Sequence, residues 1–269
     1  EPLATRYDGP GSPETGILYL HPSPEFPMKR LLAAGAGPIW QISRVFRGGE
    51  RGRVHNPEFT MLEWYRPGWT HEQLMDEVAA LIAAVAGPRP VRWQTYAEAL
   101  APLAIDPHRD TLADLLAAAE RLDVAAPTGL DREGALDLLL SHCVVPTLGR
   151  DRLDFIHGFP ACQAALARLT DDEPPVAERF ECYLDGMEIA NGYRELTDPT
   201  EQRRRFRADQ AARVARGQSI PPLDERLLAA LDHGMPEGAG VALGLDRLFM
   251  VALGADVIDD VLAFPLDRA

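Results

Sequence analysis

Residues 39–66, with the sequence IWQISRVFRGGERGRVHNPEFTMLEWYR, predict a hairpin with a long loop. The pattern predicts a strand over residues 39–47, a glycine-rich loop over 48–57 and a second, antiparallel strand over 58–66. Arg47 ends the first strand beside that loop, where a guanidinium can bind a phosphate group. The hairpin therefore indicates both an antiparallel sheet and an anion-binding position.

The second strand of this hairpin carries an unusual face. Side chains two apart in a strand point the same way, so one face is shared by Phe59, Met61, Glu63 and Tyr65. An aromatic plate, a carboxylate and a phenol in one row fit a binding surface. The row also fits a plain sheet face with its aromatic side chains in the core, and the strand pattern alone favours that structural role. Arg47 beside the loop shifts the balance towards binding.

A second hairpin is predicted over residues 179–196, with Asp185-Gly186 as its two-residue turn. In this register Tyr183 lies opposite Glu188, which places Glu181 diagonally across from Glu188 at roughly 7–8 Å between backbones. Two carboxylates at that separation can share a magnesium ion that bridges nucleotide phosphates. A solvated acidic edge would give the same pattern, but both glutamates lie in otherwise apolar strands, where unpaired charges are costly.

The strand after this turn raises a problem of register. Strict alternation would place Asn191 and Glu195 on the face opposite Glu188, yet a shared pocket needs all three on one side. We therefore expect a β-bulge at Asn191-Gly192, because a bulge shifts the alternation by one residue.

A third motif, GVALGLDRL over residues 240–248, predicts a strand that runs into a helix. Its glycines permit a close approach of the backbone, and Arg247 could lie over a flat base or reach a terminal phosphate. Many strand–helix junctions carry glycine and arginine, so this motif is not specific by itself.

Helices are expected around these strands. Thr70 begins a capping box, and Asp198-Pro199 opens another helix. Residues from about 88 to 176 are rich in Ala and Leu and are interpreted mainly as an inserted helical subdomain. The chain, residues 1–269, is thus expected to be one domain with an α+β fold, an antiparallel sheet flanked by helices.

Composition limits the classes of function. The 269 residues are 46% hydrophobic and 25% charged, and no apolar run is long enough to span a bilayer. The net charge of −14 argues against a broad nucleic-acid-binding surface, but does not exclude a local basic pocket. Cys143, Cys162 and Cys182 match no zinc pattern, and no signal-peptide pattern is seen. We therefore expect a cytoplasmic protein that does not associate with membranes.

Taken together and in this order, the three motifs resemble those of class II aminoacyl-tRNA synthetases, in particular the lysyl branch. The hairpin with Arg47 and His55-Asn56-Pro57-Glu58-Phe59 is similar to motif 2 of that family, and Gly244-Leu245-Asp246-Arg247 is similar to motif 3. The resemblance covers essentially the whole chain. It is strongest to shortened paralogues of lysyl-tRNA synthetase that modify translation elongation factor P. Other segments that carry it are Ser23-Pro24-Glu25, Met28-Lys29-Arg30-Leu31-Leu32, Ala190-Asn191-Gly192 and Glu195-Leu196-Thr197-Asp198.

The resemblance implies a class II synthetase catalytic fold and an ATP-dependent ligase that uses Mg²⁺. Such an enzyme would activate lysine or (R)-β-lysine as the aminoacyl adenylate and transfer it to a lysine of elongation factor P, with tRNA not expected as an acceptor. A homodimer is implied for the full-length protein.

The resemblance also implies roles for single residues. Arg47 would hold the α-phosphate, and Phe59 would stack beneath adenine with Arg247 above it, so that Arg47 and Arg247 are the catalytic residues. Other ATP contacts are implied for Glu50, Asn56, Glu188, Ile189 and Gly244, and metal contacts for Glu181 and Glu188.

For the amino acid, the resemblance implies that Glu25 takes the amino group near the reacting carboxylate. Tyr65 and Glu195 would bind the side-chain ammonium, which needs a carboxylate and hydrogen-bond acceptors around it. The same pocket would be completed by Ser23, Glu63, Asn191 and Ala242.

Three departures from the family pattern bear on these roles. Gly49 stands where motif 2 usually has glutamate, and the nearest acid is Glu50. Ala242 replaces a glycine of lysyl-tRNA synthetases, a change that accompanies preference for (R)-β-lysine in the shortened paralogues. Motif 1, which builds the dimer interface, is expected to lie before residue 1, and no anticodon-binding barrel is seen.

Three hypotheses remain at this stage: a ligase that modifies a protein, a catalytic fragment of an ordinary lysyl-tRNA synthetase, and a catalytically inactive synthetase-like binding module. Gly49 and the missing motif 1 favour the inactive module. The charged set Arg47, Glu181, Glu188 and Arg247 opposes it, and the acidic charge and Ala242 oppose the ordinary synthetase.

Overall fold

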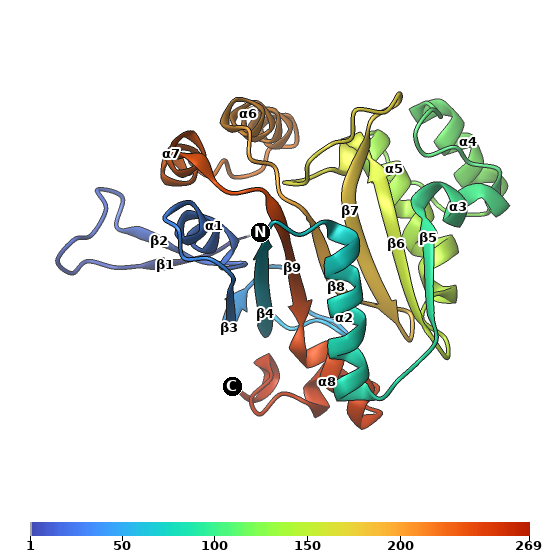
Figure 1. The fold of residues 1–269 in the computed structure, drawn as a ribbon, viewed down its shortest axis with the longest axis horizontal. Helices are drawn as coiled ribbons and strands as arrows, with labels where there is room; N and C mark the ends of the chain where they lie inside the picture. Colours follow the sequence, from blue (N-terminus) through green and yellow to red (C-terminus); the bar gives the residue numbers. More distant parts are fainter. Residues whose placement is uncertain (1) are drawn as a thin grey trace.

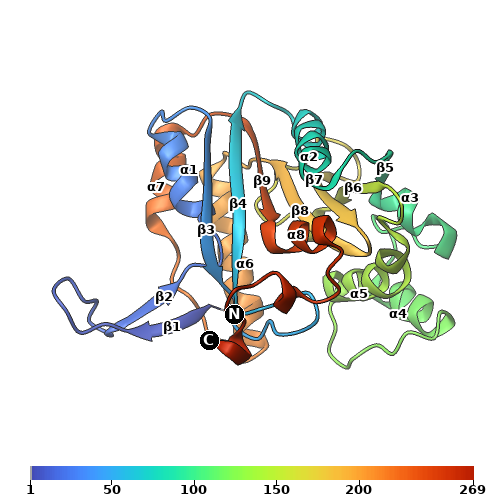
Figure 2. The same ribbon diagram turned by 90° about the horizontal axis from the view of Figure 1, so that it is seen from below.

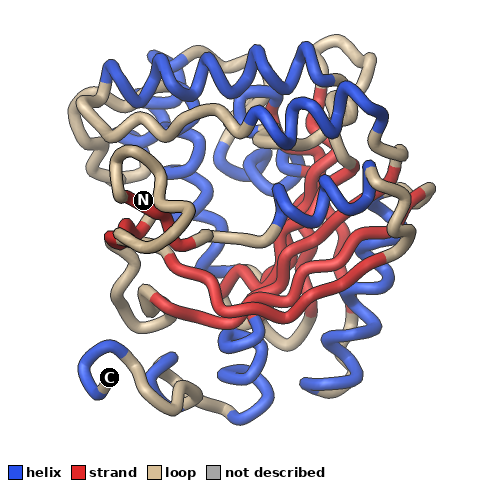
Figure 3. The backbone as a smooth tube through the Cα atoms, turned by 90° about the vertical axis from the view of Figure 1, so that its left-hand side faces the viewer, coloured by secondary structure: helices blue, strands red, loops and turns tan. Residues whose placement is uncertain are grey.

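A computed structural model describes residues 2–269, and its centre is one large sheet with helices on both faces (Figures 1 and 3). Within these residues the sheet has seven strands, which are β3 (Ile39–Phe46), β4 (Glu58–Pro67), β5 (Val91–Thr95), β6 (Leu153–Pro160), β7 (Val176–Leu184), β8 (Met187–Arg194) and β9 (Gly238–Gly244). They lie in the order β3-β4-β9-β8-β7-β6-β5. Neighbours are antiparallel except β5 and β6, which are parallel. The predicted α+β fold on an antiparallel sheet is confirmed, and the parallel pair at one edge was not expected.

The helices of the described residues are α1 (Glu25–Ala33), α2 (His71–Ala86), α3 (Tyr96–Leu100), α4 (Leu112–Arg121), α5 (Arg132–Leu139), α6 (Pro199–Ala215), α7 (Glu225–Gly234) and α8 (Leu245–Leu253). A small separate hairpin, β1 (Leu3–Arg6) with β2 (Ile17–Leu20), projects from the body (Figure 2). The predicted caps are confirmed, because Thr70 forms a capping box for α2 and Asp198 accepts two backbone N–H bonds at the start of α6.

The helical segment is narrower than the predicted range of about 88–176. Its helices α3, α4 and α5 lie between β5 and β6, and both of these strands belong to the main sheet. Two parallel neighbours need a crossover of a dozen or more residues, which this segment supplies. The Ala- and Leu-rich composition therefore concealed two strands at the ends of the range.

The two faces of the sheet have different roles. On one face, α2 and α8 cover the largest hydrophobic cluster, where Trp64, Leu74, Val78, Phe180 and Leu248 are all buried. On the other face, α1 and α7 pack at the β3 end and α3 to α5 at the β5 end, as Figure 2 shows. The strands between these two groups of helices are left to form a cavity.

The β7–β8 hairpin positions side chains for this cavity. Asp185 and Gly186 both have positive φ, as a tight two-residue turn requires, and Tyr183 pairs with Glu188 as predicted. Pairing then shifts, because Cys182 pairs with Ala190 and Ile189 is the extra residue. The β-bulge therefore exists, but at Ile189 and not at the predicted Asn191-Gly192.

Gly192 has a packing role instead of the predicted bulge role. It pairs regularly with Phe180, and a Cβ at this position would lie 2.6 Å from the Phe180 ring and 2.8 Å from Cβ of Val241. The glycine therefore lets a large ring lie directly on the strand.

No helix in the part of the chain that the structure describes has the length and apolar character needed to cross a membrane.

Replacing Gly192 with alanine should lower the free energy of unfolding by about 1–3 kcal/mol, because the added methyl overpacks the core against Phe180 and Val241. Urea unfolding followed by circular dichroism measures this change. Gly52→Ala is the matched control, since nothing lies within 4 Å of the added Cβ, and its effect should stay within about 0.5 kcal/mol. Equal effects of the two substitutions would contradict the packing role.

Candidate active site

A cavity of about 430 Å³ opens on the free face of the central strands. It brings together nearly all the residues that the sequence predicted for the site: Ser23, Glu25, Arg47, Glu50, Asn56, Phe59, Glu63, Tyr65, Glu188, Ile189, Asn191, Glu195, Ala242, Gly244 and Arg247. The remaining one, Glu181, lines a neighbouring cavity of about 540 Å³, and Glu188 and Arg247 line both. These volumes are in the range of small-molecule sites.

Strand alternation explains why these residues meet. The predicted face of β4 is confirmed, because Phe59, Met61, Glu63 and Tyr65 all line the cavity. On β8, the bulge at Ile189 places Glu188 on the same side as Asn191 and Glu195.

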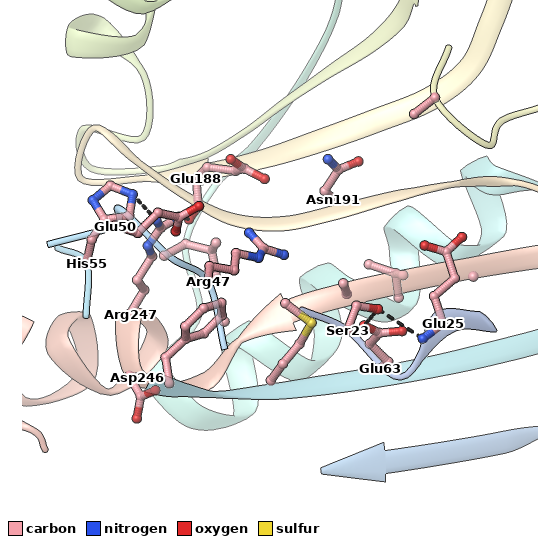
Figure 4. Close-up of a pocket in the computed structure, with 18 of the residues that line it drawn as sticks. Ser23, Glu25, Arg47, Glu50, His55, Glu63, Glu188, Asn191, Asp246 and Arg247 are labelled. Atoms are coloured by element: carbon pink, nitrogen blue, oxygen red, sulfur yellow. Dashed lines mark hydrogen bonds between the residues drawn. The ribbon is translucent and has the colours of Figure 1, made fainter. Parts of the chain in front are cut away.

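The charged side chains form two groups, as Figure 4 shows. Arg47, Glu50, His55, Glu188 and Arg247 lie at one end of the cavity. Ser23, Glu25 and Glu63 lie at the other end. The two groups make separate subsites, here called the arginine subsite and the carboxylate subsite.

At the arginine subsite, Arg47 lies over the ring of Phe59, with its guanidinium carbon 5.2 Å from the ring centroid. Arg247 is held by three contacts: Nε donates to the Val54 carbonyl (3.2 Å), one terminal nitrogen donates to the Glu188 carbonyl (2.8 Å), and the other lies 2.7 Å from Nε2 of His55. Two fixed guanidiniums beside an aromatic plate suit a nucleotide with its phosphates.

His55 has a part in this arrangement that the sequence analysis did not assign. Burial and the neighbouring Arg247 lower the pKa of His55, so its ring is neutral near pH 7. A neutral imidazole nitrogen can accept the hydrogen bond that Arg247 donates.

Asn56 and Asp246 are buried, and each forms hydrogen bonds with the backbone. The Asn56 amide donates to the Glu58 carbonyl (2.7 Å), and its oxygen accepts from the Leu266 N–H (3.2 Å). The Asp246 carboxylate accepts from the Thr60 N–H at 2.5 Å, and Figure 4 shows it directed away from the cavity. Asn56 thus ties the C-terminal segment to the site.

Glu181 and Glu188 share one face of the β7–β8 hairpin, as predicted. Burial and the nearby Glu181 raise the pKa of Glu188 to about 7. Within residues 2–269, no cluster of three or more His, Cys, Asp or Glu side chains could hold a metal. Two carboxylates nevertheless fit Mg²⁺, which is commonly bound by one or two carboxylates together with substrate phosphates.

Arg179 was missed by the sequence analysis, although it touches two predicted site residues. Its guanidinium pairs with Glu181 and donates to the Asn191 side-chain oxygen (3.2 Å) and to the Gln163 carbonyl (2.8 Å). It also lies 4.3 Å from the centroid of the Phe159 ring. Arg179 therefore fixes Glu181 relative to Asn191.

At the carboxylate subsite, Glu63 is only 2% exposed. The hydroxyls of Ser23 and Tyr65 donate to its two oxygens at 2.5 and 3.1 Å. Burial and the nearby Glu25 raise the pKa of Glu63 to about 7. A buried carboxylate with hydroxyl donors and no basic side chain bound to it is a site for a cation from outside.

Glu25 and Glu195 also belong to this subsite, and both form ion pairs with Lys29. Nζ of Lys29 lies 2.6 Å from an oxygen of each carboxylate, and the Tyr193 hydroxyl donates to Glu25. The other Glu195 oxygen, Oε1, has no hydrogen-bond partner among the described residues. Burial raises the pKa of Glu195, and the Lys29 ammonium opposes that rise.

Gly240 makes room for this arrangement. A Cβ at Gly240 would come within 2.4 Å of both Glu195 Oε1 and the Tyr65 ring. The glycine in the third motif therefore permits Glu195 and Tyr65 to meet over the strand. A glycine flanked by strand residues was the only sequence signal for this contact.

Residues 4–268 match the family described as tRNA synthetases class II (D, K and N). A protein of Pectobacterium atrosepticum named elongation factor P–(R)-β-lysine ligase is 50% identical over 100% of this chain and 83% of its own length. Proteins with the same name from Salmonella arizonae and Klebsiella pneumoniae are each 49% identical, with the same coverage of both chains.

The change in the free energy of unfolding with pH should depend on Glu63. The unfolded chain releases the Glu63 proton near pH 4.5, whereas the folded protein releases it near pH 7, so the folded state binds more protons between these values. The free energy of unfolding should therefore fall by up to about 3 kcal/mol as the pH rises from 4.5 to 7.

Glu63→Gln should remove this contribution, because the amide does not ionise. Denaturant unfolding at pH 5 and pH 7.5 measures the difference for both proteins. An equal pH dependence in the two would show that folding does not raise the pKa of Glu63.

Proposed function

Because the chain belongs to the class II tRNA synthetases of the D, K and N group, we propose that it is an ATP-dependent ligase for lysine-like amino acids. It activates lysine or (R)-β-lysine as the aminoacyl adenylate and transfers the aminoacyl group to a lysine of elongation factor P. The relatives that cover the whole chain carry the name of this activity.

The observation that carries the choice of amino acid is the carboxylate subsite. Glu63 and Glu195 are 2% and 3% exposed, the Tyr65 hydroxyl donates to Glu63, and the Tyr65 ring and Glu195 both lie next to Gly240. Their charges need a cation, and Lys29 serves only Glu195 of this pair. A substrate ammonium placed between Glu63, Tyr65 and Glu195 would satisfy both Glu63 and the free oxygen of Glu195.

The first step joins the amino acid to ATP. A carboxylate oxygen of the amino acid attacks the α-phosphorus, the bond from that phosphorus to pyrophosphate breaks, and an aminoacyl adenylate forms. No protein nucleophile is needed, so catalysis comes from placing the reactants and from stabilising negative charge at phosphorus. Arg47 supplies that charge stabilisation, and Phe59 and Arg247 hold the adenine between them.

Magnesium fits the same end of the cavity. Glu188, together with Glu181, would hold Mg²⁺, which when bound neutralises charge on the phosphates and orients them. Arg179 keeps the Glu181 carboxylate in place.

The second step transfers the aminoacyl group. The ε-amine of an acceptor lysine attacks the adenylate carbonyl carbon, the bond from that carbon to the AMP oxygen breaks, and an amide forms with loss of one proton from the amine. The products are the modified acceptor and AMP.

The test offers the protein ATP with lysine, (R)-β-lysine or norleucine and follows ATP–pyrophosphate exchange. Lysine and (R)-β-lysine should support exchange, and norleucine should not, because it leaves Glu63 and Glu195 without a cation. Elongation factor P and lysine tRNA are then offered as acceptors. Transfer to tRNA alone would refute the protein-modifying activity and favour an ordinary synthetase.

Replacing Arg47 with alanine should lower the exchange rate on the order of 10²–10³-fold and leave the fold intact, since Arg47 lies in the cavity over the Phe59 ring and is not part of the buried core. Exchange kinetics with circular dichroism as a folding control check this. An exchange rate near that of the unchanged protein would remove Arg47 from the phosphate site.

Replacing Ala242 with glycine should narrow the preference between (R)-β-lysine and lysine. Ala242 pairs with Glu63 on one side and Asn191 on the other, so its methyl lies on the floor of the amino-acid pocket. One methyl is worth about 1–3 kcal/mol at most, which gives a preference and not exclusion. Competition between the two amino acids in the exchange assay measures it, and an unchanged ratio would contradict this steric role.

A further inference from the structure

Lys29 is the only lysine in this sequence. The chain has 27 lysine and arginine residues, of which 26 are arginines. The one ammonium side chain is also among the most buried groups of the protein, with 1% of its surface exposed. Elsewhere in residues 2–269, the ion pairs that the structure records use arginine, apart from one contact between His71 and Glu72. The use of a lysine at position 29 therefore calls for a local explanation.

The contacts of Lys29 are all within the carboxylate subsite. Its ammonium bridges Glu25, one turn earlier on α1, and Glu195, directly after β8, at 2.6 Å from each. It also lies 5.2 Å from the centroid of the Tyr193 ring. Lys29 thus links the helix to the strand through two residues that the proposed function assigns to the amino acid.

We propose that Lys29 is a positioning residue, a resident cation that holds Glu25 and Glu195 in place and sets the charge of the subsite for an amino acid with two ammonium groups. This inference rests on the proposed function, and it adds a specificity residue to it.

The charge balance supports this role. When ionised, Glu25, Glu63 and Glu195 carry three negative charges. The positive charge of Lys29 neutralises one of them, so the subsite has a net charge of −2. After activation, the carboxyl group of lysine or (R)-β-lysine is an uncharged mixed anhydride, and two ammonium groups remain. The two negative charges of the subsite then match the two positive charges of the substrate. Without Lys29 a third buried negative charge would remain unpaired, at a large desolvation cost.

The geometry favours an ammonium over a guanidinium. An ammonium is a compact charge with three donors in a tetrahedral arrangement, which suits two carboxylates from different elements and an aromatic face. A guanidinium is planar and has five donors, which this closed space cannot all satisfy. Although burial alone would lower it, Glu195 and Glu25 raise the pKa of Lys29 above its ordinary value, so the cation is permanent at physiological pH.

The first experiment measures ATP–pyrophosphate exchange for Lys29→Met and Lys29→Arg in the full chain. Lys29→Met, which keeps the length but not the charge, should raise KM for lysine at least about tenfold and leave KM for ATP within about twofold. Lys29→Arg should recover part of the loss. A lysine KM unchanged in Lys29→Met, or Lys29→Arg as impaired as Lys29→Met, would overturn the proposal.

Met28→Ala is the matched control for packing. Met28 is 2% exposed on the same helix and belongs to the hydrophobic cluster beneath α1. This substitution should lower the melting temperature without changing KM for lysine. A rise in lysine KM equal to that of Lys29→Met would assign the effect to helix packing and overturn the charge role.

The second experiment needs no substitution and decides the matter if the variants do not fold. Protein grown with ¹⁵N-lysine contains a single labelled side-chain ammonium, which is the Lys29 Nζ. Its resonance should move when lysine or (R)-β-lysine is added and stay in place with ATP alone. A resonance that saturating amino acid does not move would overturn the proposal.

The proposed function and this inference fail in different ways. If the unchanged protein shows no lysine-dependent exchange, the proposed function is wrong, and the inference that rests on it is also wrong. If the unchanged protein activates lysine and Lys29→Met does so with the same KM, only the role of Lys29 is wrong.

Discussion

Buried negative charge on the central strands determines where the helices can pack and where the cavity lies. Glu63 on β4 and Glu195 directly after β8 are almost fully buried, and burying a carboxylate without a partner costs several kcal/mol. The protein offsets this cost with hydroxyl donors for Glu63 and with Lys29 for Glu195. A sheet face with such groups cannot be covered by apolar helices, so the helices pack at its two ends and leave the middle open.

Two glycines allow the charged face and the apolar face to exist on the same thin sheet. Gly240 lets the Tyr65 ring and Glu195 approach the strand on the cavity side. Gly192 lets the Phe180 ring lie against the strand on the opposite side, where the main hydrophobic cluster is. The cavity therefore lies directly above the hydrophobic core, with only the sheet between them. A loss of core packing at Phe180 would also displace Asn191, the neighbour of Gly192.

Much of the site could be predicted from sequence because it depends on local periodicity. Alternation along β4 placed Phe59, Glu63 and Tyr65 together, and the Asp185-Gly186 turn fixed the register of Tyr183 with Glu188. These features need only the chain's own geometry.

What could not be predicted depends on contacts between distant segments. The alternation of Glu188, Asn191 and Glu195 indicated a bulge but did not fix its position, and only the position of the Phe180 ring shows why the backbone at Gly192 is regular. Lys29 reads in sequence as an ordinary cation on a helix, and the partner that gives it a function, Glu195, lies 166 residues later. Strands β5 and β6 were hidden because their pairing depends on a crossover, and composition does not report pairing.

The rigid strands also explain which differences between substrates the site can and cannot detect. Phe59 of the arginine subsite and Glu63 of the carboxylate subsite lie on one strand, four residues or about 13 Å apart along it. The backbone therefore fixes the distance between the two subsites, and the proposed reaction needs an amino acid whose length matches it. Lysine and (R)-β-lysine have the same six-carbon chain and the same distance from carboxylate to terminal ammonium, so this spacing accepts them equally. They differ in the position of the other amino group by one carbon. A side group near that amino group can distinguish them, and the Ala242 methyl, between Glu63 and Asn191, is the one that we propose for this role.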